Sequence, residues 1–247
     1  MKPRVLFVHA SAALYGSDKV LLNLVRGFAS GGEWQPLVLL PEDGPLRAAL
    51  ADSGVEVHVV PLAKISRAMF GRTDPLALWR ELRRAGRAID SAVAGRAVHL
   101  VYSNTVAVLG GAWWARRQRC PHLWHVHEII LNPALVRWGL PRVVQALSKR
   151  VISNSNQTQG WLLQQAPRLA GRASVVHNGI APMAIANPEQ VADRIDRIDL
   201  AAQDIIVEHH VLQALVGGLP ADHEQGDALF DAPADEAFLG REVEDVE

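Results

Sequence analysis

Two histidines and a glutamate stand together in the segment His125-Val126-His127-Glu128, which follows a short apolar run. In an extended chain His125 and His127 point to one side, whereas Val126 points to the other. Such groups can bind a metal ion or hydrogen-bond to a sugar or a phosphate, but their spacing is not that of a zinc-binding helix. They can also be buried and satisfied by the backbone. We interpret His125 as a buried residue, and expect His127 and Glu128 to contact a ligand.

The loop after the first apolar run contains Tyr15, Gly16, Ser17 and Asp18. A glycine lets the backbone approach a ligand, and the first turn of a following helix offers free N–H groups to a phosphate. The alternative is a tight turn in which Ser17 or Asp18 caps that helix. The Gly-x-Gly-x-x-Gly fingerprint of dinucleotide binding occurs nowhere in the chain.

Two later loops carry short polar side chains. Asn154 and Ser155 follow one apolar run, and Asn178 follows another within His177–Ile180. Short polar side chains after a strand are typical of turns and helix caps, and Asn-Gly requires only a turn with positive φ. Turn formation and ligand contact are therefore both open interpretations of these loops.

Short apolar runs alternate with longer segments of helical periodicity. Continuous apolar runs indicate strands buried on both faces, as in a parallel sheet. We expect strands at Arg4–His9, Pro36–Leu40, Val55–Val60, Val98–Tyr102, Leu123–Val126, Val151–Ser153 and Ser174–Val176. We expect helices from Ser17 or Asp18 to Gly31-Gly32, over Gly44–Ser53, from Asp74-Pro75 onward, and over Thr105–Arg117, Pro133–Leu147 and Asn156–Gln165. The alternation predicts an α/β fold, a Rossmann-like doubly wound and mainly parallel sheet, with its ligand site at the carboxyl ends of the strands.

The net charge changes sign after residue 183. Residues 1–183 hold 22 Lys+Arg and 10 Asp+Glu, whereas residues 184–247 hold 3 and 16. We expect a domain over residues 1–182 and an acidic tail over residues 183–247, helical around Val191–Val216 or disordered. The break in composition indicates either a truncated or frame-shifted end, or an acidic segment that docks on the basic domain or on a partner.

The composition excludes several classes of protein. The single cysteine, Cys120, rules out an intramolecular disulfide framework, and we interpret it as incidental. No apolar stretch reaches about 18–20 residues, and His9 interrupts the N-terminal run, so we expect a cytoplasmic protein without a signal peptide. The arginines at 80–87 and 116–119 come without a nucleic-acid-binding motif, so no nucleic acid is expected as a partner. We interpret them as solvated helix faces, with peripheral contact to an anionic lipid surface at the inner face of the membrane as the alternative.

Taken in order, these motifs resemble the N-terminal domain of a family-4 glycosyltransferase of the GT-B type. The resemblance covers about residues 4–182 and rests on six pieces in the correct order. They are Val5–His9 with Tyr15–Leu22, Leu39–Pro41 with Gly44–Leu46, Tyr102–Thr105, His125–Glu128, Val151–Ser155 and Val175–Ile180.

The resemblance implies transfer of a sugar from a UDP- or GDP-sugar to a glycan, a lipid or another acceptor, with retention and without a metal or other cofactor. It implies a dissociative reaction in which negative charge builds on the leaving diphosphate. The family's glycine loop near the donor phosphates corresponds to Gly16 and Ser17, and its histidine beside the transferred sugar corresponds to His127, the catalytic candidate. The residues that would line the acceptor side of the cleft by position are Tyr15, Asn104, Glu128, Asn154, Ser155 and Asn178.

In this family a C-terminal domain supplies most nucleotide contacts, through a Gly-Arg loop, a lysine and a Glu-x7-Glu pair. Residues 184–247 contain no lysine, and Glu236 and Glu244 have the pair's spacing without its glycine-rich context. We therefore expect the donor-binding domain to be missing and the chain to be incomplete or inactive alone. A non-catalytic glycan- or sugar-binding module is the alternative. A nicotinamide oxidoreductase is disfavoured because the dinucleotide fingerprint is absent.

Overall fold

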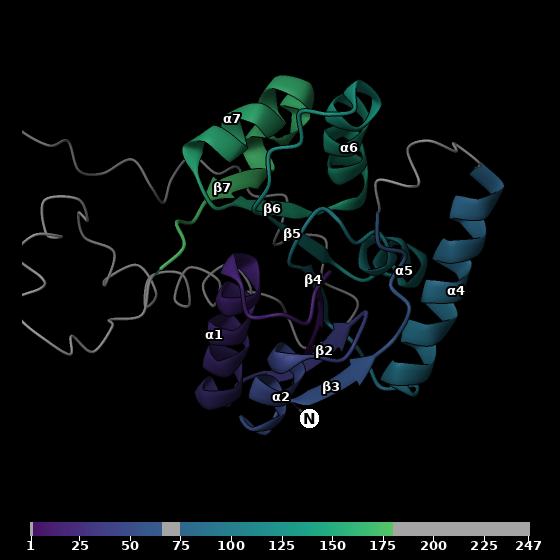
Figure 1. Ribbon diagram of the computed structural model, residues 1–247, viewed down its shortest axis with the longest axis vertical. Helices are drawn as coiled ribbons and strands as arrows, with labels where there is room; N and C mark the ends of the chain where they lie inside the picture. The colour runs from purple at the N-terminus through teal and green to yellow at the C-terminus, as the bar shows by residue number, and fades with distance from the viewer. Residues whose placement is uncertain (1, 66–74, 180–247) are drawn as a thin grey trace, which may run out of the picture.

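The computed structural model describes residues 2–65 and 75–179 of the chain. These residues form one sheet with helices packed against it (Figure 1). The strands are β1 (Arg4–Val8), β2 (Gln35–Leu40), β3 (Glu56–Val59), β4 (Leu100–Ser103), β5 (His122–Val126), β6 (Arg150–Ser153) and β7 (Ala173–Val175). The helices are α1 (Gly16–Gly31), α2 (Pro45–Ala51), α4 (Pro75–Val93), α5 (Gly110–Gln118), α6 (Ala134–Leu147) and α7 (Asn156–Gln165), with a 3-10 helix η1 (Pro167–Arg172).

The sheet is parallel throughout, with the strand order β3-β2-β1-β4-β5-β6-β7. The chain first builds outward from β1 to β3, then returns to the centre and builds outward from β4 to β7. The order therefore reverses between β1 and β4, which is the switch point where ligands of doubly wound sheets bind. The predicted Rossmann-like α/β fold is confirmed.

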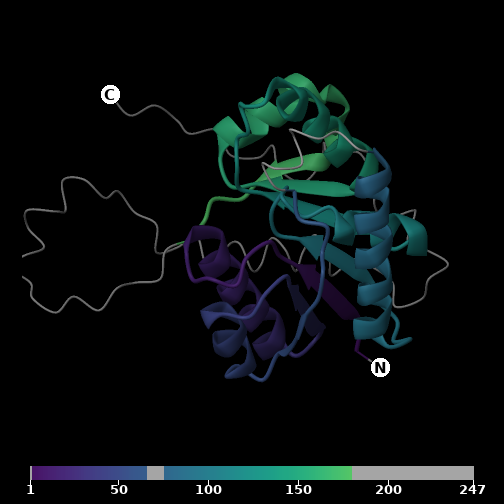
Figure 2. The same cartoon turned by 45° about the vertical axis from the view of Figure 1, so that its right-hand side comes forward.

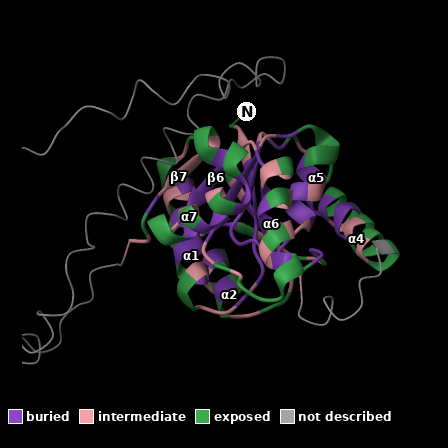
Figure 3. Ribbon diagram, turned by 90° about the horizontal axis from the view of Figure 1, so that it is seen from above, coloured by how far each residue is buried: buried purple, intermediate pink, exposed green. Residues whose placement is uncertain are grey.

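Helices cover both faces of the sheet. Phe7 packs on one face against Phe28 of α1 and Tyr102 of β4, with ring centroids 5.5 and 5.1 Å away, in a core shared with α2. Leu6 and Val8 point to the other face, into a core with α4 and α5. Helices α6 and α7 continue that layer over β5 and β6. Figure 2 shows α4 on the opposite side of the sheet from α1 and α2, and Figure 3 shows buried residues along the inner sides of the helices.

The strands lie within two residues of their predicted bounds, but the helix predicted over residues 105–117 begins only at Gly110. The preceding residues pair with a distant segment instead: Ile65 N–H donates to the Ala107 carbonyl (2.7 Å) and Gly110 N–H to the Leu62 carbonyl (3.0 Å). A Cβ on Gly110 would lie 2.4 Å from the Leu62 oxygen, so only glycine fits this approach.

The prediction that Ser17 or Asp18 caps α1 is wrong. Tyr15 is the N-cap residue, and the helix begins at Gly16. Asp18 lies in the first turn, and its Oδ2 accepts a hydrogen bond from the Tyr15 backbone N–H (2.9 Å). Such reach-back from the third helical residue is half of a capping box.

Several predictions fall outside the described residues. These are the acidic tail, its helix over Val191–Val216, the domain boundary at residue 182, and Asp74 as the cap of α4. Pro75 opens α4 as predicted.

Candidate functional site

Four neighbouring strands end in polar residues at one edge of the sheet. His9 follows β1, Asn104 follows β4, His127 follows β5 and Asn154 follows β6. Because β1, β4, β5 and β6 are adjacent and parallel, the residues after them lie side by side. This edge contains the switch point, so it is where the fold would bind a ligand.

Hydrogen bonds join the ends of β1, β4 and β5 into one network. His127 Nε2 lies 3.1 Å from Asn104 Oδ1. Asn104 Nδ2 donates to the Ser17 carbonyl at 2.9 Å and lies 3.3 Å from His9 Nδ1. His9 Nε2 lies 2.6 Å from Asp18 Oδ1. His9, Asn104 and Asp18 are buried, and a buried network whose members are satisfied holds its side chains in one arrangement.

The partners of Asn104 assign the protons of both histidines. Its amide nitrogen faces the Ser17 carbonyl, which can only accept, so its amide oxygen faces His127. His127 Nε2 therefore carries the proton, and Nδ1 presents a lone pair. In the same way His9 Nδ1 accepts from Asn104, and its Nε2–H points to Asp18. Within the described part of the chain His127 Nδ1 is buried and has no hydrogen-bond partner.

Burial keeps His127 neutral. It lowers the pKa of His127 to about 4, and the proximity of His9 acts in the same direction. For Asp18, burial alone would raise the pKa, but hydrogen bonds from His9 and from the Tyr15 backbone outweigh it and lower the pKa. The network therefore holds an ionised carboxylate at one end and an uncharged imidazole at the other.

His125 and His127 do point to the same side of the strand. Their ring centroids are 3.9 Å apart, with the planes tilted by 40°. His125 is fully buried, and its Nδ1 lies 2.6 Å from the Tyr102 hydroxyl. The interpretation of His125 as a buried residue is confirmed, although a side chain supplies this partner rather than the backbone.

Glu128 lies next to His127, and the pKa of its carboxyl group is raised. Burial raises the pKa of Glu128, and hydrogen bonds from backbone N–H groups, that of Val106 first, only partly offset this. Its Oε2 is buried without a hydrogen-bond partner in the described ranges. A carboxyl group in this state can hold a proton or receive one from a ligand.

Asn154 and Ser155 have structural partners. Ser155 is the N-cap of α7, where its Oγ accepts from the Thr158 N–H (3.1 Å). Asn154 Nδ2 donates to the His127 carbonyl (3.3 Å), and its Oδ1 accepts from the Thr158 hydroxyl (2.9 Å). The cap interpretation holds for Ser155, and Asn154 ties the end of β6 to that of β5. Ligand contact by either residue stays a prediction.

Exposure differs among three other predicted ligand contacts, Tyr15, Gly16 and Asn178. The Tyr15 side chain is 80% exposed. A Cβ on Gly16 would meet no atom within 4 Å, so the space beside the start of α1 is open. Asn178 follows β7, beyond the network, and its Oδ1 is buried without a partner among residues 2–65 and 75–179. Contact of these three with a ligand stays a prediction.

Sequence reasoning missed His9 and Asp18 as members of the site. The sequence feature that could have indicated them is a histidine, His9, at the end of the first apolar run, with a carboxylate, Asp18, nine positions later. Their pairing depends on how the intervening loop folds back, which spacing alone does not give. In the described residues no three His, Cys, Asp or Glu side chains are grouped as a metal ion would need.

Comparison with known proteins gives a family and a fold. Residues 15–183 match the sequence model of Glycosyltransferase Family 4. Among solved structures, the HepE protein of Anabaena in complex with UDP-glucose is 16% identical, with a TM-score of 0.56 over 87% of this chain and 66% of that one. The same protein in complex with UDP is 20% identical, with a TM-score of 0.54 over 79% and 50%. A glycosyltransferase from Rickettsia africae ESF-5 is 13% identical, with a TM-score of 0.56 over 79% and 49%.

These likenesses cover this chain more fully than they cover the other proteins. The chain spans between half and two thirds of the length of the Anabaena structures it matches, and no curated protein matches it by sequence. At such identities the solved structures show the fold. The family model, by contrast, covers more than half of the sequence, and on that ground the chain belongs to Glycosyltransferase Family 4.

Proposed function

We propose that this domain takes part in the transfer of a sugar from a UDP- or GDP-sugar to a glycan, lipid or other acceptor. The observation that carries the proposal is His127, a neutral, buried imidazole whose Nδ1 lone pair has no partner in the described residues, at the switch-point edge of a family member's sheet. The UDP and UDP-glucose bound by the Anabaena protein of the same fold support a nucleotide-sugar donor.

His127 would act on the sugar as a hydrogen-bond acceptor. Its Nε2–H is committed to Asn104, so Nδ1 is the atom left for a sugar hydroxyl. In a dissociative reaction positive charge develops on the sugar ring. A protonated imidazole beside the sugar ring would oppose that positive charge. The low pKa of His127 keeps its imidazole uncharged at neutral pH. The His9–Asp18 pair serves as support because it orients Asn104, and through it His127.

The start of α1 would face the departing diphosphate. Gly16 leaves open space there, and the first helical N–H groups favour negative charge. The Asp18 carboxylate in the same turn points to His9 and to the Tyr15 N–H, and its negative charge would partly offset this attraction. The matched structures are longer than this chain. We therefore propose that a C-terminal domain makes most of the nucleotide contacts and that the described domain forms the acceptor side of the cleft.

The proposed location is the cytoplasm, with peripheral contact to the inner face of the membrane. None of the helices in the described ranges combines the length and the apolar character needed to cross a bilayer. Contact would therefore come from a surface of the domain.

The test is nucleotide release from pooled UDP- and GDP-sugars with mixed acceptors, by the chain alone and with a separately produced C-terminal domain of the family. We expect turnover only with that domain, reduced at least about a hundredfold by His127→Ala. The control is His58→Ala, at the far end of the sheet, which should change the rate less than about twofold.

A binding measurement separates the remaining outcomes. Without turnover, sugar-induced changes in the NMR signals of His127 but not of His58 would favour the non-catalytic sugar-binding module. No turnover and no change at His127 with any donor or sugar would overturn both functions.

A further inference from the structure

The segment that leads from Glu128 into α6 carries large apolar side chains on its outside. Leu131 is 58% exposed, Leu135 67% and Trp138 48%. On α6, Leu135, Trp138 and Arg142 follow one another at helical spacing and so share a face. The opposite face, with Val136, Leu140 and Val144, is buried in the core. We name the outer surface formed by Leu131, Leu135, Trp138, Arg137 and Arg142 the Trp138 face.

Two arginines flank the indole of this face. Arg137 Cζ lies 5.4 Å and Arg142 Cζ 5.8 Å from the centroid of the Trp138 ring. An indole with guanidinium groups over its ring suits a boundary between water and hydrocarbon, because the indole and the arginine stems contact apolar material while the charges stay near anions. The Trp138 face therefore combines insertion of apolar groups with attraction to negative charge.

The same combination recurs on α4. Trp79, in the second turn, is 44% exposed, and Arg83 Cζ lies 4.7 Å from its ring centroid. Helices α4 and α6 both pack in the layer that contains α5, and both begin at the carboxyl edge of the sheet. Figure 3 shows green, exposed surface on both helices when the molecule is seen from above. Two Trp–Arg pairs thus occupy the N-terminal halves of two helices at the edge that holds His127.

The charge on the two helices is mainly positive. On α6 the charged residues are Arg137 and Arg142, without any Asp or Glu, and α4 carries four arginines against Glu81 and Asp90. Such a surface repels a second copy of itself, so a symmetric dimer face is disfavoured. It attracts a surface of anionic headgroups, at about 1 kcal/mol for each cation close to it.

We propose that the Trp138 face, with the Trp79–Arg83 pair of α4, docks this domain on an anionic lipid surface and so holds the His127 edge beside a membrane-embedded acceptor. The docking itself follows from exposure, spacing and charge. Only its consequence for the acceptor rests on the proposed sugar transfer.

The test is co-sedimentation of the full chain with vesicles of phosphatidylcholine, with and without phosphatidylglycerol. We expect binding to the anionic vesicles alone, weakened by salt. Leu135→Ser with Trp138→Ser should reduce it about tenfold or more, and Trp79→Ser about twofold to fivefold. Val59→Ser, an exposed valine at the end of edge strand β3, is the matched control and should bind as the unchanged chain does.

A second variant guards against misfolding of the first. Arg137→Gln with Arg142→Gln should keep the circular dichroism spectrum, weaken binding and flatten its salt dependence. Equal binding to neutral vesicles, no binding by the full chain, or full binding by the serine variant would each overturn the proposal. Because no nucleotide-sugar is present, failure here leaves the nucleotide-release result untouched, and the reverse also holds.

Discussion

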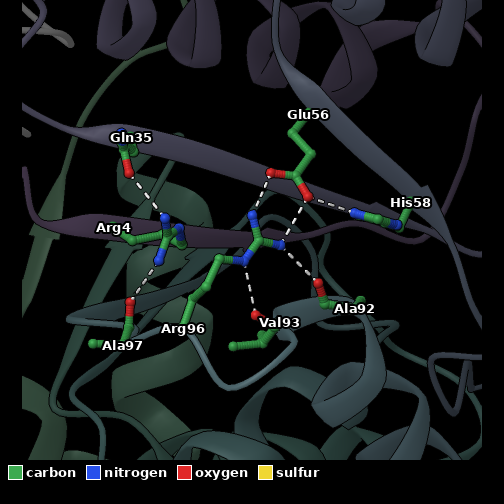
Figure 4. Close-up of polar contacts among 8 residues, drawn as sticks. All are labelled: Arg4, Gln35, Glu56, His58, Ala92, Val93, Arg96 and Ala97. Carbon is green, nitrogen blue, oxygen red and sulfur yellow. Dashed lines mark hydrogen bonds and ion pairs between the residues drawn. The ribbon is translucent and has the colours of Figure 1, made fainter.

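The two ends of the sheet use polar residues in opposite ways. At the amino end (Figure 4), Arg96 donates to both carboxylate oxygens of Glu56 (2.7 and 2.8 Å), and His58 Nε2 lies 2.7 Å from the same carboxylate. Arg4 donates to Gln35 Oε1 (2.9 Å) and to a backbone carbonyl. These groups are partly exposed and satisfied by one another. At the carboxyl end the network is buried and stops at His127 Nδ1 and Glu128 Oε2, which no described residue satisfies.

This difference bears on where a ligand would bind. A groove of about 530 Å³ lies at the amino end, lined by Arg4, Gln35, Glu56 and Arg96 among others. A groove of this volume could hold a small ligand. Its hydrogen-bonding groups are already committed to one another, however, whereas the carboxyl end holds polar atoms that no residue in the described ranges satisfies. The carboxyl end is therefore the proposed ligand site, although its buried groups also contribute to stability.

Acid should separate His127 at the carboxyl end from the Glu56 network at the amino end most strongly. Burial lowers the pKa of His127 to about 4, whereas an unfolded histidine titrates near 6.5. The unfolded chain then binds this proton first, so the contribution of His127 to stability is complete above about pH 6.5 and falls as the pH drops toward 4. It amounts to up to about 3 kcal/mol, a sizeable part of a typical domain's stability.

The Glu56 network at the amino end should respond only in stronger acid. The hydrogen bonds from Arg96 lower the pKa of Glu56 to about 2, so its contribution is present above about pH 4.5 and is lost below it. Urea midpoints measured from pH 7 to pH 3 check both windows. Glu56→Gln should not change the loss of stability between pH 6.5 and 4, whereas His127→Gln should reduce that loss. A wild-type curve that is flat down to pH 4.5 would contradict the assignment.

Removing one carboxylate from each end is the next largest contrast. Asp18→Ala leaves the buried His9 Nε2–H without its acceptor and should cost about 3 kcal/mol of unfolding free energy. Glu56→Ala removes a partly exposed ion pair and should cost less than about 1 kcal/mol. Denaturant titration at pH 7 measures both. Equal losses of unfolding free energy would mean that the buried network at the carboxyl end is no more stabilising than the partly exposed network at the amino end.

Two glycines near the carboxyl ends of the strands differ in the space around them: Gly44 is closely packed and Gly16 is not. A Cβ on Gly44 would lie 2.5 Å from the Ala12 carbonyl oxygen, which also accepts from the Leu46 N–H. Gly44→Ala should therefore destabilise the fold by about 1–3 kcal/mol. Gly16→Ala has free space and should be neutral or slightly stabilising, yet it should slow transfer if donor phosphates approach there. Thermal melts with the nucleotide-release assay distinguish the two effects.

The fold was largely readable from the sequence because its signals are local. Apolar runs such as Val5–Val8 predict a strand without any other information. The polar residues that follow such runs indicate the candidate site at the carboxyl ends of the strands. The late start of α5 was not readable, because it depends on how closely Gly110 approaches the distant Leu62 carbonyl. The His9–Asp18 pair was missed for the same reason, since a loop must first fold back to bring the two together.

The smallest expected effect concerns the amide of Asn104, and it tests the proton assignment directly. Asn104→Asp keeps an acceptor for His127 Nε2–H but adds a negative charge and removes the donor to the Ser17 carbonyl. An adjacent carboxylate favours the imidazolium, so the pKa of His127 should rise by about 1–2 units. Histidine ¹⁵N shifts followed across a pH series measure this rise. If His127 keeps its low pKa in a folded Asn104→Asp variant, Asn104 does not hold its proton, and the carboxyl end loses the link that ties His9 and Asp18 to His127.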